Sequence, residues 1–473
     1  MVLYESKEHE VDNPNDFKDF ESKGLEVEKP NDFKDSESDD GIVLLDDPNL
    51  FPDGGLRAYT VVVGAFIGFI GTLGFVNSLG VLQTYITTNI LTSTSESKIG
   101  WIFSIYGFLS FGMTLISGPV FDRLGCKIPL LVGLIMQTTG FMCMSLSTEL
   151  YQFILSFSIL GGLGTSFTFA PLLGCISHWF YRNRAQVVGL AYVGGAIGGI
   201  IFPLLFRSLL PKVGFGWTIR IGAFMVFGFL MTGFLLVADR KAIIQKSHVK
   251  NGEDKESIQK DNITTEILKS IDFRVFKDPI YSGLVLALLF NGFAFLITLT
   301  YMPSYAVANG ANQNSSYLLL VVFNSMSIPG RIIPGIFADR YGRFNTLCII
   351  ATTSTIAFCI IWLPPPIGHK TVSIYIFAGV YGFTSGSVLS LTPACIGQIC
   401  KTKDFGKRAG TAFFILSFGD LFGVPIGGAI IGKNESVSGF DHLVIFISVL
   451  SFLGAVSAYV SRYLYRGFKL VKV

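Results

Sequence analysis

Long apolar runs dominate the chain from residue 58 onward, and polar stretches separate them. Twelve runs reach or approach the length of about 20 residues that a helix needs to cross a hydrocarbon core of roughly 30 Å. Six precede a polar stretch at 239–278 and six follow it. The runs are 58–85, 99–121, 128–146, 151–177, 185–205, 217–238, 280–301, 317–338, 346–362, 372–396, 409–431 and 442–463. The pattern predicts an all-α membrane protein with about twelve transmembrane helices in two six-helix halves.

The polar stretches set the expected domain boundaries. Residues 1–53 hold 17 acidic and 5 basic side chains, and the motif Pro-Asn-Asp-Phe-Lys-Asp occurs there twice, at 14–19 and 30–35. Such a segment buries too little apolar surface to order itself, which predicts an acidic disordered tail at 1–53. We expect six-helix bundles at 54–238 and 279–464, a linker at 239–278 between them, and a short basic tail at 465–473.

Basic residues in the short loops predict the orientation of the chain. They gather on one side of the expected membrane and are scattered singly on the other. The gathered residues include Arg123, Lys127, Arg182, Arg184, Arg340, Arg343, Lys407 and Arg408. Both termini are therefore expected in the cytoplasm. The sequons at Asn314 and Asn434 then fall in outer loops, where they are candidate glycosylation sites.

Composition and motifs exclude several classes of protein. Only 15% of the residues are charged, against about a quarter in soluble proteins. The seven cysteines form no C-x-x-C pair, the five histidines lack metal-ligand spacing, and the spans contain no nucleophile motif or phosphate-binding loop. The sequence predicts no metal, no cofactor, no enzyme and no nucleic-acid partner. The expected partners are the lipid bilayer, a small organic solute and protons, and the sequence says nothing of an accessory subunit.

A short loop pattern occurs at equivalent places in the two halves. Both copies fit G-x-x-x-D-R-x-G followed by a basic residue, with Asp122 and Asp339 217 residues apart. Two such loops indicate an internal duplication. The glycines permit tight turns, and each aspartate could pair across helices or meet a helix N-terminus. The residues of the pattern are Gly118, Asp122, Arg123 and Gly125 in the first copy and Gly335, Asp339, Arg340, Gly342 and Arg343 in the second.

The repeated loop resembles the signature loop of the major facilitator superfamily. That resemblance implies the major facilitator fold, with the loop as a latch of the inner gate. Two further motifs, before the first helix and at the start of the fifth, are similar to the signatures of the monocarboxylate transporter family, in particular its fungal branch with the baker's-yeast homologues. Their residues are Asp53, Gly54 and Gly55, and Phe180, Arg182, Arg184 and Gly189. The family's usual Trp-Gly-Trp after the two glycines is absent here.

Charged side chains inside spans are costly and are therefore functional candidates. Arg331, in the eighth run, could clamp a carboxylate with two hydrogen bonds or cap backbone carbonyls. Its position resembles that of the arginine that binds the substrate in monocarboxylate carriers. Asp420, in the eleventh run, could carry a proton or form a permanent pair with an arginine.

Two charged groups of the lactate carriers are missing. Ser327 stands in place of their aspartate, and Asn77 in place of their first-helix lysine. Asn77, Asn291 and Asn324 offer neutral hydrogen bonds instead, which favours a solute larger or more neutral than lactate. With Arg331, these asparagines are the candidate substrate-binding residues.

These features predict a secondary transporter that moves a small organic solute by alternating access, with a carboxylate-bearing solute preferred. Uptake of an anion against an inside-negative potential costs about 2.3 kcal/mol per charge per 100 mV. Such uptake would need a proton, for which Asp420 is the candidate carrier. A facilitator of a neutral solute and a non-transporting nutrient sensor are the alternatives. The resemblance implies the plasma membrane, with the vacuole or another internal membrane as the alternative.

Overall fold

The structure is a computed structural model that describes residues 51–94, 96–240, 273–311, 313–364, 370–401, 404–432 and 437–467. The chain divides into Met1–Leu44 and Leu45–Val473, and all described residues belong to the second unit. The predicted acidic tail up to residue 50, residues 241–272 of the predicted linker, residues 468–473 of the basic tail and the sequon at Asn434 lie outside the described residues. The side chain of Asn314 lies outside them as well.

Helices account for most of the described chain, and no strand occurs among its described residues. The first half contains α1 (Leu56–Val76), α2 (Leu79–Asn89), α3 (Glu96–Gly112), α4 (Thr114–Leu124), α5 (Lys127–Met144), α6 (Leu150–Phe153), η2 (Ile154–Gly161), α7 (Gly162–Trp179) and α8 (Arg184–Leu236). The second half contains η4 (Phe273–Lys277), α11 (Pro279–Ala308), α12 (Gln313–Tyr341), α13 (Arg343–Ala357), η5 (Phe358–Trp362), α15 (Thr371–Ile396), α16 (Phe405–Ile431) and α17 (Val437–Arg466).

Eleven helices in the described part of the chain are long and apolar enough to cross a membrane. One of them, α8, has 53 residues and would measure about 80 Å if straight, far more than a hydrocarbon core. Its backbone breaks at Gly214, where φ is +73°. Phe206 before the break lies beside Gly222 after it, so α8 folds back on itself. Counted as two arms, α8 brings the total to the twelve crossings that the apolar runs predict.

Replacing Gly214 by alanine is expected to destabilise the turn between the two arms of α8. A residue with a Cβ that is held in this sparsely populated backbone region costs about 1–3 kcal/mol. Among the described residues, no atom lies within 4 Å of the Cβ that alanine would add, so backbone strain and not a clash is the cause. The unfolding temperature of the purified protein should fall in the alanine variant and also in an asparagine variant, because a φ of +73° with a ψ of +174° is a backbone conformation essentially restricted to glycine. Equal stability of all three proteins would contradict the break at this position.

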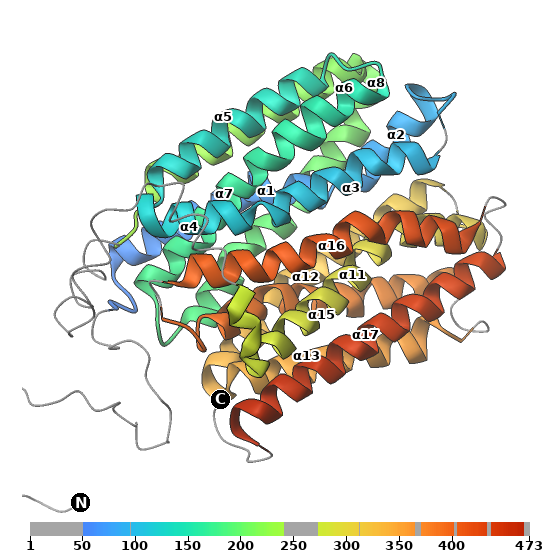
Figure 1. Cartoon of the computed structure of the whole chain (residues 1–473). Coiled ribbons are helices and arrows are strands. Elements are labelled where there is room, and N and C mark those ends of the chain that lie inside the picture. The colour runs from blue at the N-terminus through green and yellow to red at the C-terminus, as the bar shows by residue number, and fades with distance from the viewer. Residues whose placement is uncertain are drawn as a thin grey trace, which may run out of the picture. The chain divides into compact units, whose positions relative to one another are not determined.

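The two halves lie side by side, with the first half in blue to green and the second in yellow to red (Figure 1). Within the first half, glycines bring α1 and α8 together: a Cβ on Gly194 would overlap the Phe66 carbonyl oxygen, and one on Gly74 would overlap Gly198. Small residues allow such close approach of helix backbones. Between the halves, α8 packs against α12, and α3 and α4 pack against α16. These contacts form the walls of the cavity described below.

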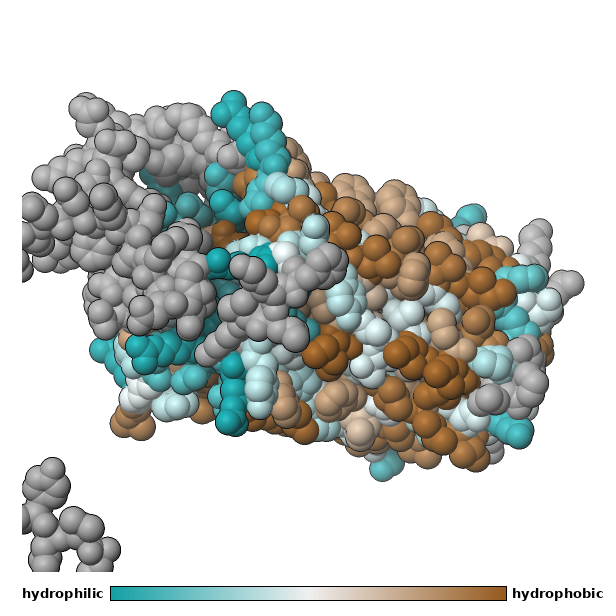
Figure 2. Space-filling model, turned by 90° about the horizontal axis from the view of Figure 1, so that it is seen from below, coloured by the Kyte–Doolittle hydropathy of each residue, from teal (hydrophilic) through white to brown (hydrophobic). Residues whose placement is uncertain are grey.

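Apolar side chains cover the outward faces of several helices. Exposed examples are Ile349 and Ile356 on α13 and Val449, Phe452 and Val456 on α17. Figure 2 shows hydrophobic residues over much of one face, with hydrophilic residues gathered toward one end. Soluble monomers rarely expose apolar surface of this extent. Together with the length of the helices, this surface identifies an integral membrane protein.

Candidate functional site

A cavity lies between the two halves, and helices of both halves line it. These helices are α1, α2, α3, α7 and α8 from the first half and α11, α12, α15 and α16 from the second. Asn77 lines the cavity at the break between α1 and α2, where the first span is interrupted. Irregular backbone at membrane depth is tolerated where it lines such a cavity.

Aromatic rings make up a large part of the cavity wall. Six are among the lining residues: Phe103, Phe111, Phe169, Tyr192, Phe295 and Phe413. Phe169 bridges the halves, with its ring centroid 5.4 Å from that of Phe111 and 5.0 Å from that of Phe413. Aromatic pairs at such distances contribute about 0.5–1.5 kcal/mol beyond the area they bury. The cavity therefore offers aromatic surface from both halves to a flat ligand.

Three buried polar atoms of the lining have no hydrogen-bond partner in the described part of the chain. They are Nε of Arg331, the hydroxyl of Tyr192 and Oδ2 of Asp420. These residues are only 3%, 3% and 6% exposed, respectively. An unpaired buried polar group costs about 1–3 kcal/mol, and more when it is charged. Their convergence on one cavity indicates a place for a polar ligand or for water.

Close packing between α8, α12 and α15 fixes the position of Arg331. Its Nη1 donates to the backbone carbonyl of Tyr192, and its Cζ lies 6.0 Å from the centroid of the Tyr192 ring. A Cβ on Gly189 would overlap the Arg331 carbonyl oxygen, and one on Gly386 would come within 2.6 Å of Ser327 Oγ. The Arg331 guanidinium therefore caps one backbone carbonyl, which is one of the two roles that the sequence allows for it. Its Nε remains available to another hydrogen-bond partner.

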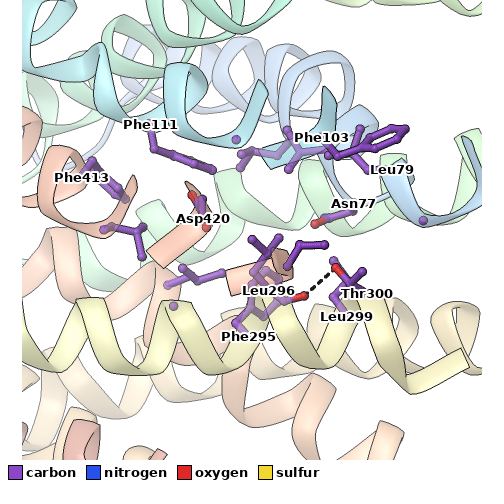
Figure 3. A pocket seen from close by; sticks show the side chains of 18 of the residues that line it. Asn77, Leu79, Phe103, Phe111, Phe295, Leu296, Leu299, Thr300, Phe413 and Asp420 are labelled. Carbon is purple, nitrogen blue, oxygen red and sulfur yellow. Dashed lines mark hydrogen bonds between the residues drawn. The ribbon is translucent and has the colours of Figure 1, made fainter. Parts of the chain in front are cut away.

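Asp420 lies where α16 meets α3. A Cβ on Gly107 would come within 3.2 Å of the Asp420 Cβ, so a glycine at this position leaves room for the carboxyl group. Figure 3 shows Asp420 in the cavity, with Phe111 and Phe413 on one side of it and Asn77 further away on the other. Arg331 and Asp420, both in the described chain, share the cavity without forming an ion pair. The permanent arginine pair considered for Asp420 is thus not formed with Arg331 in this conformation.

The three candidate asparagines occupy different environments. Asn77 lines the cavity, and its Nδ2 donates to the Gly195 carbonyl at 3.1 Å. Asn324 lies next to it, with its Oδ1 against Gly199 of α8. Asn291 lies on the side of α11 that faces α17. A Cβ on Gly454 of α17 would overlap the side-chain amide of Asn291. The structure therefore brings Arg331, Asn77 and Asp420 to one cavity, places Asn324 beside it and places Asn291 outside its lining.

Both repeated loops reach across to the opposite half. Asp122 accepts hydrogen bonds from the amides of Gly406 and the next residue, at 3.2 and 2.9 Å, at the start of α16. Asp339 accepts from the amides of Ala185 and the next residue, at 3.2 and 2.7 Å, at the start of α8. Helix N-termini carry unpaired amides and partial positive charge, which favour a carboxylate. We call these contacts the Asp122 latch and the Asp339 latch, and the end of the bundle where they lie the latch end.

Glycines leave room for both latches. A Cβ on Gly118 would overlap the carbonyl oxygen of Gly406, and one on Gly335 would come within 3.0 Å of the α8 backbone. Gly125 and Gly342 have φ values of +78° and +106°, a backbone conformation that favours glycine and turns the chain after each latch. The glycines of the repeated pattern therefore serve close approach and tight turns.

The arginines of the repeated loops differ in their surroundings. Arg343 Nε lies 3.1 Å from Asp339 Oδ1, and its Nη2 donates to the Tyr181 carbonyl of the other half at 2.7 Å. Arg340 is exposed, and Arg123 is half-buried. Arg343 therefore reinforces the Asp339 latch directly.

The two remaining sequence motifs meet beside the Asp339 latch. Asp53 accepts from the amides of Tyr181 and Arg182 at 2.8 and 2.9 Å. Arg184 is 1% exposed and donates to three backbone carbonyls, one of them Gly397 of the other half at 2.7 Å. No pattern in the sequence indicates that Asp53 lies against this loop, because the two motifs are far apart in the chain.

The other motif residues shape the start of α1 and its contact with α7. Gly54 and Gly55 precede α1, and Gly55 has a φ of +91°. Phe180 is fully buried, with its ring centroid 5.8 Å from that of Tyr59. These residues have structural roles at the latch end and do not line the cavity.

Comparison with known proteins decides the family. The sequence pattern of the Major Facilitator Superfamily matches residues 63–390, which is most of the chain. The chain belongs to the Major Facilitator Superfamily. It is 37% identical to the riboflavin transporter MCH5 of Saccharomyces cerevisiae, covering 89% of this chain and 81% of that protein. It is 31% identical to the aspyridones efflux protein apdF of Emericella nidulans, covering 86% and 78%, respectively.

Solved structures agree with the fold. The proton:xylose symporter XylE matches with a TM-score of 0.64 at 14% identity, covering 85% of this chain and 94% of that one. The human organic anion transporter MFSD10 matches with a TM-score of 0.60 at 16% identity, covering 85% and 99%. Membership of the superfamily, with fungal relatives named as a transporter and an efflux protein, makes this chain a secondary transporter of a small solute and not an enzyme. Its fungal relatives are named for different solutes, so membership of the family does not by itself give the solute.

Proposed function

We propose that this major facilitator protein carries a planar aromatic solute with hydrogen-bond acceptors across a membrane by alternating access. The observation that carries the proposal is the meeting, in one cavity, of six aromatic rings with the unpaired polar atoms of Arg331, Tyr192 and Asp420. The rings would contact the flat faces of the solute, and Arg331 would donate to an acceptor at its edge. Riboflavin, for which the yeast relative is named, has this chemistry.

A monocarboxylate or another carboxylate-bearing solute is the second candidate, and Arg331 favours it. A guanidinium is planar, stays charged and matches the geometry of a carboxylate. Nη1 is already bonded to the Tyr192 carbonyl, whereas Nε is unpaired. A carboxylate would satisfy that donor with a charge-assisted hydrogen bond. Asn77 would supply a neutral polar contact in the same cavity for either solute.

Asp420 is the proton site in this proposal. The other ionisable side chains among the described residues of the cavity lining are Arg331 on α12 and Tyr192 on α8. Asp420 lies at the contact between α3 of one half and α16 of the other. Because alternating access separates the halves along such contacts, the exposure of the carboxyl group to water would change during the cycle. A proton that binds in one state and leaves in the other would couple transport to a proton gradient.

The latches would close one end of the pathway in this proposal. Basic residues of the loops favour a cytoplasmic position of the latch end, so the described conformation would be closed toward the cytoplasm. Both termini would then be cytoplasmic, and the plasma membrane or an internal membrane would hold the carrier.

Binding and transport assays with a solute panel test the proposal. Purified protein would be heated with riboflavin, benzoate as an aromatic carboxylate, lactate as a small one, and xylose as a non-aromatic control. A solute at 100 times its Kd adds about 2.7 kcal/mol to the native state. We expect riboflavin and benzoate to raise the unfolding temperature and xylose to leave it unchanged. Stabilisation by lactate alone would contradict the aromatic proposal. Binding without flux in proteoliposomes would indicate a sensor.

Replacing Asp420 by asparagine is expected to remove the pH dependence of uptake. The amide has nearly the shape of the carboxyl group but cannot bind and release a proton, so only a proton-dependent step should be lost. Uptake into proteoliposomes would be measured with and without an imposed pH gradient. In the wild type an inward proton gradient should increase uptake, whereas the variant should show the same facilitated flux under both conditions. A variant that still responds to the gradient would place the proton site elsewhere.

A further inference from the structure

Asp53 lies outside the cavity lining, yet it holds the loop on which the Asp339 latch closes. Its Oδ1 accepts hydrogen bonds from the amides of Tyr181 and Arg182 at 2.8 and 2.9 Å. The amide of Asp53 donates in turn to the Trp179 carbonyl at 3.2 Å. These bonds tie the segment before α1 to the loop between α7 and α8.

The opposite half holds the same two loop residues. Nη2 of Arg343 donates to the carbonyls of Tyr181 and Arg182 at 2.7 and 3.3 Å. Nε of Arg343 contacts Asp339 at 3.1 Å, and Asp339 accepts from the first amides of α8. Tyr181 and Arg182 are therefore bound through their amides to Asp53 of their own half and through their carbonyls to Arg343 of the other half.

The backbone at Asp53 is strained, and its surroundings compensate the strain. Asp53 has a φ of +47°, in the left-handed region that residues other than glycine rarely adopt. Phe51, 6% exposed, packs on Tyr181 with 5.3 Å between ring centroids. Such strain persists where the surrounding structure over-determines it, and it clusters at functional sites. A carboxylate is thus held in an unfavourable conformation so that it can reach two amides of the loop.

We infer that Asp53 is a positioning residue of the gate. It fixes Tyr181 and Arg182 in the conformation that Arg343 and Asp339 require for docking from the other half. The two motifs that are far apart in the sequence form one unit in this way. Loss of the Asp53 carboxylate shifts the protein toward conformations in which the latch end is open, without altering any residue of the cavity.

Hydrogen–deuterium exchange of the full-length protein in lipid nanodiscs tests the inference. Asp53→Gly removes the carboxylate and permits the left-handed backbone, while Asp53→Asn keeps the Oδ1 acceptor and also tolerates that backbone. For Asp53→Gly we expect about tenfold faster exchange at the start of α8, the amides of the Asp339 latch. We expect a similar increase at the start of α16, because the halves separate as units and both latches open together. Asp53→Asn should stay near the wild type.

Two results would overturn the inference. Faster exchange confined to residues 180–186, with the start of α16 unchanged, would mean that Asp53 stabilises its own loop and not the gate. Unchanged exchange at both latches would mean that Asp53 does not position the gate. Phe51→Ala is a milder second variant, and it should show the same paired increase on a smaller scale.

A matched control removes a different carboxylate. Asp278 caps α11 by accepting from the Ile280 amide at 3.0 Å. Asp278→Gly should speed exchange at the start of α11 and leave both latches at the wild-type rate. Thermal stabilisation by riboflavin or benzoate should persist in Asp53→Gly, so a failure of the solute proposal and a failure of this inference give different results.

Discussion

Replacing Arg331 by glutamine is expected to weaken solute binding about 10- to 100-fold and to reduce transport accordingly. A hydrogen bond to a charged group contributes about 1.5–3 kcal/mol, and each 1.4 kcal/mol is a factor of ten. The Tyr192 carbonyl that accepts from Arg331 in the wild type lies inside α8, where carbonyls accept backbone hydrogen bonds of the helix, so it keeps a partner when the guanidinium is removed. The described chain places no carboxylate against Arg331, so its removal leaves no buried partner unpaired. Stability without solute should therefore change little.

Solute titrations of the purified variants measure this effect. Arg340→Gln is the control, because Arg340 lies on the same helix but is exposed. It should bind as the wild type does. Arg331→Lys keeps the charge but loses the planar fork, and we expect it to recover only part of the binding. If Arg331→Gln loses benzoate but binds riboflavin normally, Arg331 is specific for carboxylates. Normal binding of both would show that the solute does not contact Arg331.

Replacing Gly118 by valine is expected to prevent the Asp122 latch from closing. The added side chain would overlap the carbonyl oxygen of Gly406 across the boundary between the halves. Overpacking of this kind costs about 1–3 kcal/mol, so the latched conformation should lose about 10- to 100-fold in population relative to open ones. Transport should fall steeply, because a carrier that cannot close one end cannot complete its cycle.

Exchange of the latch amides distinguishes this effect from misfolding. In Gly118→Val the starts of α16 and α8 should both exchange faster, while buried segments of α1 and α17 keep the wild-type rate. Gly228→Val is the matched control, since no atom of the described chain lies within 4 Å of the Cβ it would add. It should leave transport and both latches unchanged. Wild-type transport by Gly118→Val would refute a gating role for the Asp122 latch.

The course of the chain was predictable because spanning helices need long apolar runs. The apolar runs predict twelve crossings, and the described chain has them once α8 is divided at Gly214. The repeated loops left two roles open for Asp122 and Asp339, a pair across helices or a contact with a helix N-terminus, and the structure shows the second. Which helix each aspartate would meet was not predictable, because the partners lie in the opposite half and no local pattern encodes them.

The residues that line the cavity were harder to predict from the sequence. Arg331, Asn77 and Asp420 stand out because polar groups inside a span are costly, and the cavity lining contains all three. Asn291 stands out for the same reason but faces α17. On a helix that is apolar on all sides, periodicity does not tell a cavity face from a helix contact. Tyr192 and the phenylalanines gave no signal, because aromatic residues in spans serve packing as readily as binding.

Among the described residues, the cavity lining contains one arginine and one carboxylate, and this has an electrical consequence for the empty carrier. With Asp420 ionised, these two groups have no net charge. The conformational change of the empty carrier would then move no net charge across the membrane and produce no current. With a proton on Asp420, the same step would move one positive charge, worth up to about 2.3 kcal/mol per 100 mV. Transient currents on a supported membrane would therefore report proton occupancy before any solute is identified.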